Sequence, residues 1–502
     1  MKKISIIILL SGFIITGCTN KLEEINVNPN QPDKVSNAGL LLPNVIRSSA
    51  RSNLTNSYNR FAIAADQLAE DFQSNFSNWV RADAASYSYW NFYDYIRDLN
   101  TVIDLADKQS LNNYKGVALV LRSWMFQCLT DTYGPIPFRE ADNASLQNIT
   151  QPKFEKQEDV YAGLLQDLHE ANTLLGSSSE NVVGDILYNG NITRWKQFAS
   201  GLMLRLLLRE SDRVDPSAAM QEIVSQPDLY PLFTSHEDQA ALQYIADRPE
   251  NEMPLYRSQS SGYGTGTRIT QTFLNELEGL NDPRMYAFAS PTSASLTAGT
   301  RVYKGEVNGT GAFNDPPNSS PAGMLWTSIF FSPDLASPNA AQSVILSYSE
   351  VQFTLAEAAE KGFIAGGSAK AEEYYLNGIK DQFKYYASRI PSNYTFPKSS
   401  DIIPPSSYYD QPEVAYTGTQ QEKLHKIWLQ KRFALFLCGA EAWSEWRRTN
   451  FPDIQPGPQS PGYVPLRCLY PADEMRINTQ NYNEAVSWLG ADDMTQHVWW
   501  DK

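Results

Sequence analysis

Aromatic residues in irregular segments are the side chains whose chemistry stands out in this sequence. Trp79 lies between two predicted helices, and Asn78 and Arg81 lie beside it. A Trp or Tyr ring can stack on the apolar C–H face of a sugar while neighbouring polar groups bind the hydroxyls, and a peptide can use the same kind of surface. We therefore predict that rings in loops contact a ligand, with Asn78, Trp79 and Arg81 as one group. For each ring, a packing role in the core is the alternative.

The sequence offers little for catalysis or metal binding. His169 and His236 are each followed by Glu, as in the zinc motif HExxH, but neither has the second histidine one helical turn later. Asp66, Glu70 and Asp71 are expected on one helix, where they would form a solvated face rather than a pair of acids across a cleft. Motifs for a P-loop, an EF-hand loop and a nucleophile elbow are absent from the sequence. We predict no catalytic residue, no metal site and no cofactor.

The first residues predict export and lipidation. Two lysines precede an apolar run over 4–15, and Cys18 follows two further residues, Thr16 and Gly17. The run is shorter than the roughly 20 residues that span a membrane, so it is interpreted as a cleaved signal peptide, 1–17. Residues 15–18 resemble the lipobox of bacterial lipoproteins, and two acyl chains on Cys18 are enough for stable anchoring. The alternative is a plain signal peptide with a chance cysteine.

Residues 18–35 are predicted to form a lipidated tether. Asn and Pro dominate the run 26–32, which is typical of a linker between an anchor and a domain. Glu23 and Glu24 loosely resemble the acidic surface-export signal of Bacteroidetes lipoproteins, which would place the protein on the outer face of the outer membrane. An ordinary solvated linker is an equal alternative.

Charge and cysteine content limit the classes of partner and bond. The formal net charge is −15, and nucleic acids require clustered Lys and Arg, so this class of partner is excluded. Cys128 and Cys438 lie in apolar stretches and are predicted to be buried thiols. A disulfide between two of Cys128, Cys438 and Cys468 stays open, because sequence gives no distance.

Apolar residues at helical spacing predict a mainly α-helical fold. In the window 158–175, Val160, Leu164, Leu168 and Leu175 form one stripe. Pairs of such helices recurring at ~30 to 40 residues predict an α-solenoid, although the TPR consensus is not legible. Trp90, inside a predicted helix, is assigned to the core. The predicted helices cover 36–57, 58–72, 84–107, 111–132, 158–175, 193–210, 269–280, 347–362, 369–388 and 419–438.

Two irregular stretches interrupt the helices. Residues 226–339 are rich in Gly, Ser, Pro and Asn with one clear helix, and 392–418 are similar. Embedded aromatic residues argue against disorder, so we expect ordered loops on a scaffold. The mature chain is accordingly predicted to consist of a helical scaffold, 36–225, and a loop-rich ligand-binding region with C-terminal helices, 226–502, packed together as one domain.

Seven segments follow one another in a fixed order along nearly all of the chain: NVNPNQP (26–32), DTYGPIPF (131–138), YAGLLQDLHEA (161–171), WKQFASGLMLRLLLR (195–209), SYSEVQFTLAEAAEKG (347–362), QKRFALFLCGAEAWSEWRR (430–448) and RCLYPADEMRIN (467–478). Together they resemble the SusD/RagB family and within it the second SusD-like subgroup. Any one of them alone would be weak, but their shared order makes the match specific. Most are interpreted as scaffold: Gly134 and two prolines should end a helix, and Glu445 and Arg448 should form an ion pair along one helix.

The resemblance implies a fold and a function. It implies TPR-like helix pairs in the N-terminal half, a loop-rich portion that carries the ligand surface, and no enzymatic activity. It also implies capture of a nutrient, foremost an oligosaccharide, for a SusC-like TonB-dependent transporter in the outer membrane. In the family, a tryptophan between helices and rings from the later loops build the ligand platform, which here corresponds to Trp79, Tyr263, Trp326 and Tyr256.

Three alternatives stay open from the sequence. The ligand could be a peptide, as for RagB-like proteins of the same system. A surface glycoside hydrolase would require a carboxylate pair in the main cleft, and a purely structural lid would lack an aromatic platform. The identity of the nutrient depends on loop geometry that the sequence does not fix.

Overall fold

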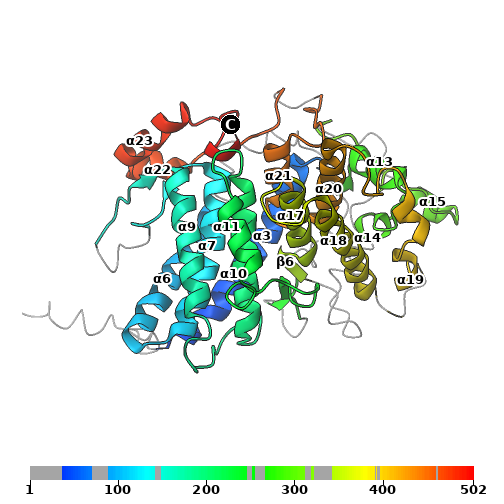
Figure 1. Ribbon diagram of the computed structural model, residues 1–502. Coiled ribbons are helices and arrows are strands. Elements are labelled where there is room, and N and C mark those ends of the chain that lie inside the picture. Colours follow the sequence, from blue (N-terminus) through cyan, green and yellow to red (C-terminus); the bar gives the residue numbers. More distant parts are fainter. Residues whose placement is uncertain are drawn as a thin grey trace, which may run out of the picture.

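The computed structural model describes residues 37–70, 89–141, 148–245, 251–254, 266–310, 318–320, 342–390, 392, 396–458 and 462–501. Helices dominate these ranges, which confirms the predicted mainly α-helical fold (Figure 1). None of the described helices combines the length and apolarity that crossing a bilayer requires.

Helices of the N-terminal half form one group of neighbours, coloured blue to green in Figure 1. They are η1 (Ala38–Leu40), α3 (Leu42–Asn56), η4 (Tyr89–Asn91), α6 (Phe92–Gln109), α7 (Asn112–Tyr133), α9 (Gln157–Leu174), α10 (Ile192–Arg209) and α11 (Ser217–Ser225). Helix α7 packs between α6 and α9, and α10 packs against α9, so successive helices lie side by side as in TPR-like pairs. Trp90, predicted in the core, is half-buried and packs edge-on against Tyr133.

Local sequence sets the ends of these helices. The Asn191 side chain accepts a hydrogen bond from the Arg194 backbone amide and caps α10. Gly134, with φ 83°, ends α7 inside the motif that predicts this turn. The short strands β2 (Ile136–Pro137) and β3 (Phe154–Glu155) then form an antiparallel pair.

The prediction of a helix over 58–72 is wrong beyond Ala64, where the helical structure ends. The chain continues α3 through a π-helical turn, η2 (Ser57–Phe61), and α4 (Ala62–Ala64), and then leaves the helix at Asp66, whose φ is 50°. It continues as the strand β1 (Leu68–Glu70), which pairs with a strand about 200 residues later. That pairing is a tertiary contact with no local signal.

A second group of helices comes from the C-terminal half; α17, α18 and α20 lie beside the first group in Figure 1, whereas α22 and α23 are drawn on the side of the first group, where α23 contacts β3. Helix α17 packs against α18 and α20, and it also contacts α10 of the first group. The elements are α17 (Tyr348–Glu360), α18 (Gly367–Arg389), α19 (Ser399–Ile402), η8 (Ser406–Asp410), α20 (Gln420–Ala434), α21 (Glu441–Thr449), α22 (Ala472–Ile477), α23 (Thr479–Leu489) and η9 (Trp499–Asp501).

The predicted continuous helix over 419–438, and through the motif 430–448, is also wrong. Helix α20 ends at Ala434, and α21 starts at Glu441. Between them Leu437 and Gly439 have φ of 60° and 65°. A Cβ at position 439 would lie 2.2 Å from Asn53 Oδ1, so only glycine fits where this turn meets α3.

The irregular stretch 226–339 contains more structure than the one predicted helix. That helix is α13 (Gln271–Gly279), and the short helices α14 (Met285–Phe288) and α15 (Ser293–Thr297) follow it. The strand β4 (Ala240–Gln243) pairs with β6 (Gln342–Leu346), and β5 (Thr267–Ile269) pairs with β1. These pairs tie the loop-rich region to the helices.

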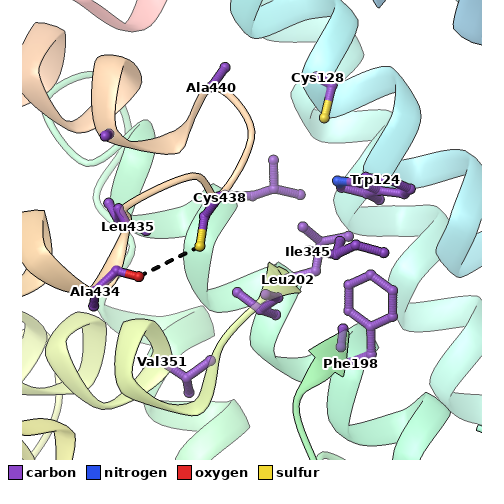
Figure 2. Packing of buried hydrophobic residues seen from close by; sticks show 14 of the residues in the cluster. Trp124, Cys128, Phe198, Leu202, Ile345, Val351, Ala434, Leu435, Cys438 and Ala440 are labelled. Atoms are coloured by element: carbon purple, nitrogen blue, oxygen red, sulfur yellow. Dashed lines mark hydrogen bonds between the residues drawn. The ribbon is translucent and has the colours of Figure 1, made fainter. Parts of the chain in front are cut away.

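One cluster of buried apolar residues runs through both groups of helices. Figure 2 shows Cys128 and Cys438 among its members, and the Cys438 thiol donates to the Ala434 carbonyl at 3.5 Å. The prediction of buried thiols is confirmed, and burial raises the pKa of the Cys128 thiol well above its ordinary value. Cys128, Cys438 and Cys468 are all free thiols, so the described chain contains no disulfide between them.

Buried ion pairs join the two groups of helices. Arg205 and Arg209 of α10 face carboxylates from α7, α17 and α21: Arg205 Nε lies 2.6 Å from Glu350, and Arg209 Nη1 lies 2.6 Å from Asp131. Arg448 holds both oxygens of Glu357 at 2.7 Å. The expected Glu445–Arg448 pair is confirmed at 2.8 Å and belongs to this larger set. We call the set the arginine network: Arg205, Arg209, Arg448, Asp131, Glu350, Glu357, Glu441 and Glu445.

Glu357 illustrates how the arginine network stabilises the fold. Burial would raise the pKa of Glu357, but the charge and hydrogen bonds of Arg448 outweigh it and lower the pKa to about 2. Because this value is below the ordinary 4.5, the ionised carboxylate stabilises the fold above about pH 5, and that stabilisation is lost as the pH falls toward 2.

Replacing Glu357 by Gln tests this interaction. Glu357→Gln leaves Arg448 buried without its main counter-charge and should lower the free energy of unfolding at pH 7 by about 3–5 kcal/mol. The difference from wild type should shrink at pH 3, because below the ordinary value of 4.5 the carboxyl group of the unfolded wild-type chain takes up a proton that the folded chain does not. Denaturant midpoints at the two pH values measure both effects.

The matched control is Glu373→Gln, on an exposed pair of α18 whose carboxylate side chain is 56% exposed. It should shift the free energy of unfolding by no more than about 0.5 kcal/mol. A Glu357→Gln chain as stable as wild type at pH 7 would contradict the role given to the arginine network.

Candidate ligand-binding site

The residues predicted to contact ligand lie outside the part of the chain that the structure describes. This holds for Asn78, Trp79, Arg81, Tyr256, Tyr263 and Trp326, and equally for the lipidation residue Cys18. The residues that flank the segments with the predicted rings are described, however.

The pair β1–β5 brings together the residues that flank two of the segments with predicted rings. Its register sets Leu68 opposite Ile269 and Glu70 opposite Thr267. The segment 71–88, with Trp79, starts directly after Glu70, and the segment 255–265, with Tyr256 and Tyr263, ends just before β5. Because the strands are antiparallel, both segments leave the same end of the strand pair.

The third segment starts beside the same strands. The Ile269 backbone amide donates to the Ser320 carbonyl at 3.4 Å, and Arg268 Nε donates to Ser319 Oγ at 3.1 Å. The segment 321–341, with Trp326, follows Ser320 directly. Trp326 is six positions after Ser320, and six residues of chain extend at most about 22 Å, so Trp326 is within chain reach of β5. Tyr263 is four positions before Thr267, the first residue of β5.

Arg432 of α20 clamps the start of β1. Its guanidinium donates to the carbonyls of Ala65 and Asp66, and its Nε lies 2.8 Å from Glu276 Oε2 on α13. The Gln67 side-chain amide donates back to the Arg432 carbonyl at 3.0 Å. The strand pair is therefore fixed to α20 and, through Glu276, to α13 rather than being an isolated strand pair, which would be only marginally stable.

Thr270 joins the other strand to the same clamp. Its hydroxyl donates to the Asp66 carbonyl at 2.7 Å and also accepts the Phe273 amide, which caps α13. The Glu306 amide donates to the Ile269 carbonyl at 3.0 Å, so the chain before 310 also packs along β5. We call β1, β5, Arg432 and Thr270 the ladder anchor.

The predicted solvated face of Asp66, Glu70 and Asp71 is wrong for the two residues that are described. Asp66 lies in a turn, is 7% exposed, and has its pKa raised to about 6 by burial against the opposing charge of Arg432. Glu70 lies in β1, half-buried, and burial raises its pKa to about 7. Asp71 lies outside the described residues. Carboxyl groups that are partly protonated near neutral pH can donate as well as accept hydrogen bonds.

Sequence reasoning missed the residues that hold the anchor. Arg432 belongs to the motif 430–448, so a signal was present, but the motif was interpreted only as scaffold. Arg268 and Thr270 carry no local pattern, because their partners are distant in sequence. The aromatic residues of the three segments are visible in the sequence, whereas the contacts among the residues that flank those segments are not.

Both histidines that begin zinc-like motifs have other partners. His169 Nδ1 lies 2.6 Å from Tyr230 Oη, and His236 Nδ1 lies 2.9 Å from Asp381 Oδ1. Over the described ranges, no three His, Cys, Asp or Glu residues gather in a way that could hold a metal ion.

Asp66→Asn tests the electrostatics of the ladder anchor. The folded pKa of Asp66, about 6, is above its ordinary 3.8, so stability should fall as the pH rises from about 4 to about 6. Asparagine tolerates the positive φ and removes the buried charge. The variant should therefore be more stable than wild type at pH 7, by about 1–3 kcal/mol, and nearly equal to it at pH 4.

Urea midpoints at pH 4 and pH 7 measure this difference, and Asp453→Asn, at an exposed position, is the control. A difference between Asp66→Asn and wild type that is the same at both pH values would contradict the raised pKa of Asp66.

Comparison with known proteins gives the family. The profile of the SusD-like family described as "Starch-binding associating with outer membrane" matches residues 29–471. No curated protein matches the chain by sequence. Among solved structures, a SusD homologue from Bacteroides fragilis NCTC 9343 has 25% identity and a TM-score of 0.79, with 93% of this chain and 99% of that chain covered.

Two further structures agree. An outer-membrane protein of Bacteroides vulgatus ATCC 8482, whose description mentions nutrient binding, has 27% identity and a TM-score of 0.79 over 93% of this chain and all of its own. A chitin-binding protein has 26% identity and a TM-score of 0.75 over the same shares. With a profile match over most of its length and these neighbours, the chain belongs to the SusD-like family of starch-binding proteins associated with the outer membrane.

Proposed function

We propose that this chain is a non-catalytic surface lipoprotein that captures an oligosaccharide and delivers it to a SusC-like TonB-dependent transporter. The observation that carries the proposal is the ladder anchor, from which three segments with candidate rings start or end. Rings held on neighbouring segments can contact successive sugar units of one chain. The proposed contacts are Trp79, Asn78, Arg81, Tyr256, Tyr263 and Trp326.

Saccharide is favoured over peptide by the relatives. The family is described as starch-binding, and one neighbour is described as chitin-binding. Both polymers present neutral rings with apolar faces and hydroxyl edges, which suits aromatic platforms with polar neighbours. The net charge of −15 adds no specific preference for a neutral ligand but disfavours acidic ones.

The described carboxylates support a binding role over hydrolysis. Those of the arginine network are paired with buried guanidinium groups and serve the fold. At Glu70, burial raises the pKa, and no carboxylate among the described residues contributes to that shift. A glycosidase uses two carboxyl groups roughly 5–10 Å apart across a cleft, whereas the carboxylates of the arginine network are already paired with guanidinium groups.

The lipidated tether completes the proposal. Cleavage after residue 17 and acylation of Cys18 would hold residues 36–502, the scaffold 36–225 together with the loop-rich region, on the membrane through the linker 18–35. This arrangement leaves the domain free to meet nutrient outside the cell and to cover a transporter.

Loss of the acylated cysteine tests the anchor. Cys18→Ser removes the sulfur that carries the lipid, so the protein should move from the detergent phase to the aqueous phase in Triton X-114 partition, and metabolic labelling with palmitate should disappear. Cys468→Ser, at a buried thiol, is the control and should still partition with detergent. Equal partition of Cys18→Ser and wild type would contradict lipidation.

Affinity electrophoresis tests the platform. Soluble starch or glycol chitin in the gel should retard the wild-type chain, and Trp79→Ala or Trp326→Ala should each weaken binding about fivefold, the value of about 1 kcal/mol per stacked ring. Trp488→Ala, on α23, is the matched control and should migrate as wild type does.

Unchanged retardation of both tryptophan variants would remove these rings from the site. Release of reducing ends from the retarding polysaccharide would contradict a non-catalytic role.

A further inference from the structure

A groove of about 370 Å³ lies on the first group of helices, between α6 and α9 and above α7. Figure 1 shows these helices on the side of the molecule away from α13, which starts directly after Thr270 of the ladder anchor. The volume falls within the range of small-molecule sites, about 300–1,000 Å³. Its lining alternates polar and apolar groups: Asn100, Ile103, Asp104, Asp107, Arg122, Phe126, Phe138, Arg139, Ala141, Gly163, Gln166 and Asp167.

Two phenylalanines and a glycine form the floor. Phe126 and Phe138 are buried and meet edge to face with centroids 4.9 Å apart. A Cβ at Gly163 of α9 would lie 2.3 Å from the Phe138 ring, so the absence of a side chain lets that ring lie directly on the helix. The floor is thus rigid and apolar.

Arg122 of α7 organises the walls. Its Nη1 donates to Asn100 Oδ1 on α6 at 3.1 Å, and its Nη2 lies 2.7 Å from Asp167 Oδ2 on α9. Its Nε is buried and makes no hydrogen bond within the described structure. The Asn100 amide also donates to the Ala141 carbonyl at 3.3 Å. These contacts hold planar donors and acceptors in fixed positions on both sides of the floor.

The charges of the walls are compensated. Asp104 lies 2.6 Å from Lys108, Asp107 lies 3.0 Å from Lys115, and Asp167 is paired with Arg122. Arg139 at the rim is paired with Glu155. No wall carries an excess of one sign, so an ionic ligand would gain little, whereas a neutral ligand with many hydroxyl groups can use both the donors and the acceptors.

From this geometry we propose that the α6–α9 groove is a second binding site, for a short neutral saccharide. It is independent of the ladder anchor in position and in residues. A polymer long enough to reach both sites would be held more tightly than by either site alone, since binding at the second site becomes intramolecular.

Ile103 lines the groove, so the NMR signal of its methyl group reports ligand binding there. In the full chain in detergent, labelled at isoleucine methyls, the Ile103 signal should shift in a saturable way on titration with maltohexaose or chitohexaose. Asp104→Ala combined with Gln166→Ala, which removes one polar wall group from each helix, should weaken this response about tenfold or more. The matched control replaces the same residue types on the same two helices but outside the groove: Gln109→Ala combined with Asp159→Ala. Its Ile103 signal should respond as in wild type.

This experiment distinguishes a wrong assignment of the groove from a wrong assignment of the aromatic rings. Trp79→Ala with Trp326→Ala should leave the Ile103 response intact even though it weakens retardation in polysaccharide gels. An Ile103 signal that moves with neither hexaose, or only with a neutral acetylated tetrapeptide, would overturn the saccharide assignment of the groove. Equal loss in the groove variant and its matched control would overturn it as well.

Discussion

Buried guanidinium groups without access to water constrain this structure more than any other feature. Arg205, Arg209 and Arg448 have side chains no more than 2% exposed, and each meets carboxylates from other helices. An unpaired charge in such a place costs several kcal/mol, so the helices that supply the partners cannot shift independently. The arginine network therefore fixes α10 against α7, α17 and α21, and with them the relative position of the N-terminal and C-terminal helices.

The same constraint extends to the candidate site through α20. Lys431 lies 3.1 Å from Glu445 of the arginine network, and the next residue, Arg432, donates to the carbonyls of Ala65 and Asp66. Two adjacent side chains thus connect the buried network to the start of β1. The strand pair that follows is short, and its place is determined by this clamp and by Thr270 rather than by its own length.

Periodicity was sufficient to predict α9, α10 and α18 to within two residues at each end, whereas α6, predicted from 84, starts at Phe92. It failed where distant residues decide the backbone. The turn between α20 and α21 depends on the contact of Gly439 with Asn53, and the burial of Asp66 depends on α20. Segments rich in aromatic residues are visible in the sequence, but the pairing of their flanking residues in β1 and β5 joins positions about 200 residues apart, which no local pattern encodes.

A crystal structure of the full chain with bound maltohexaose or chitohexaose would decide whether the ladder anchor gathers a saccharide platform. We expect an intact hexaose beside the β1–β5 end, with its sugar faces stacked on Trp79 and Trp326 at van der Waals distance. A hexaose bound without contact to any ring of 71–88, 255–265 or 321–341, or found only as cleaved products, would contradict a non-catalytic platform at this position.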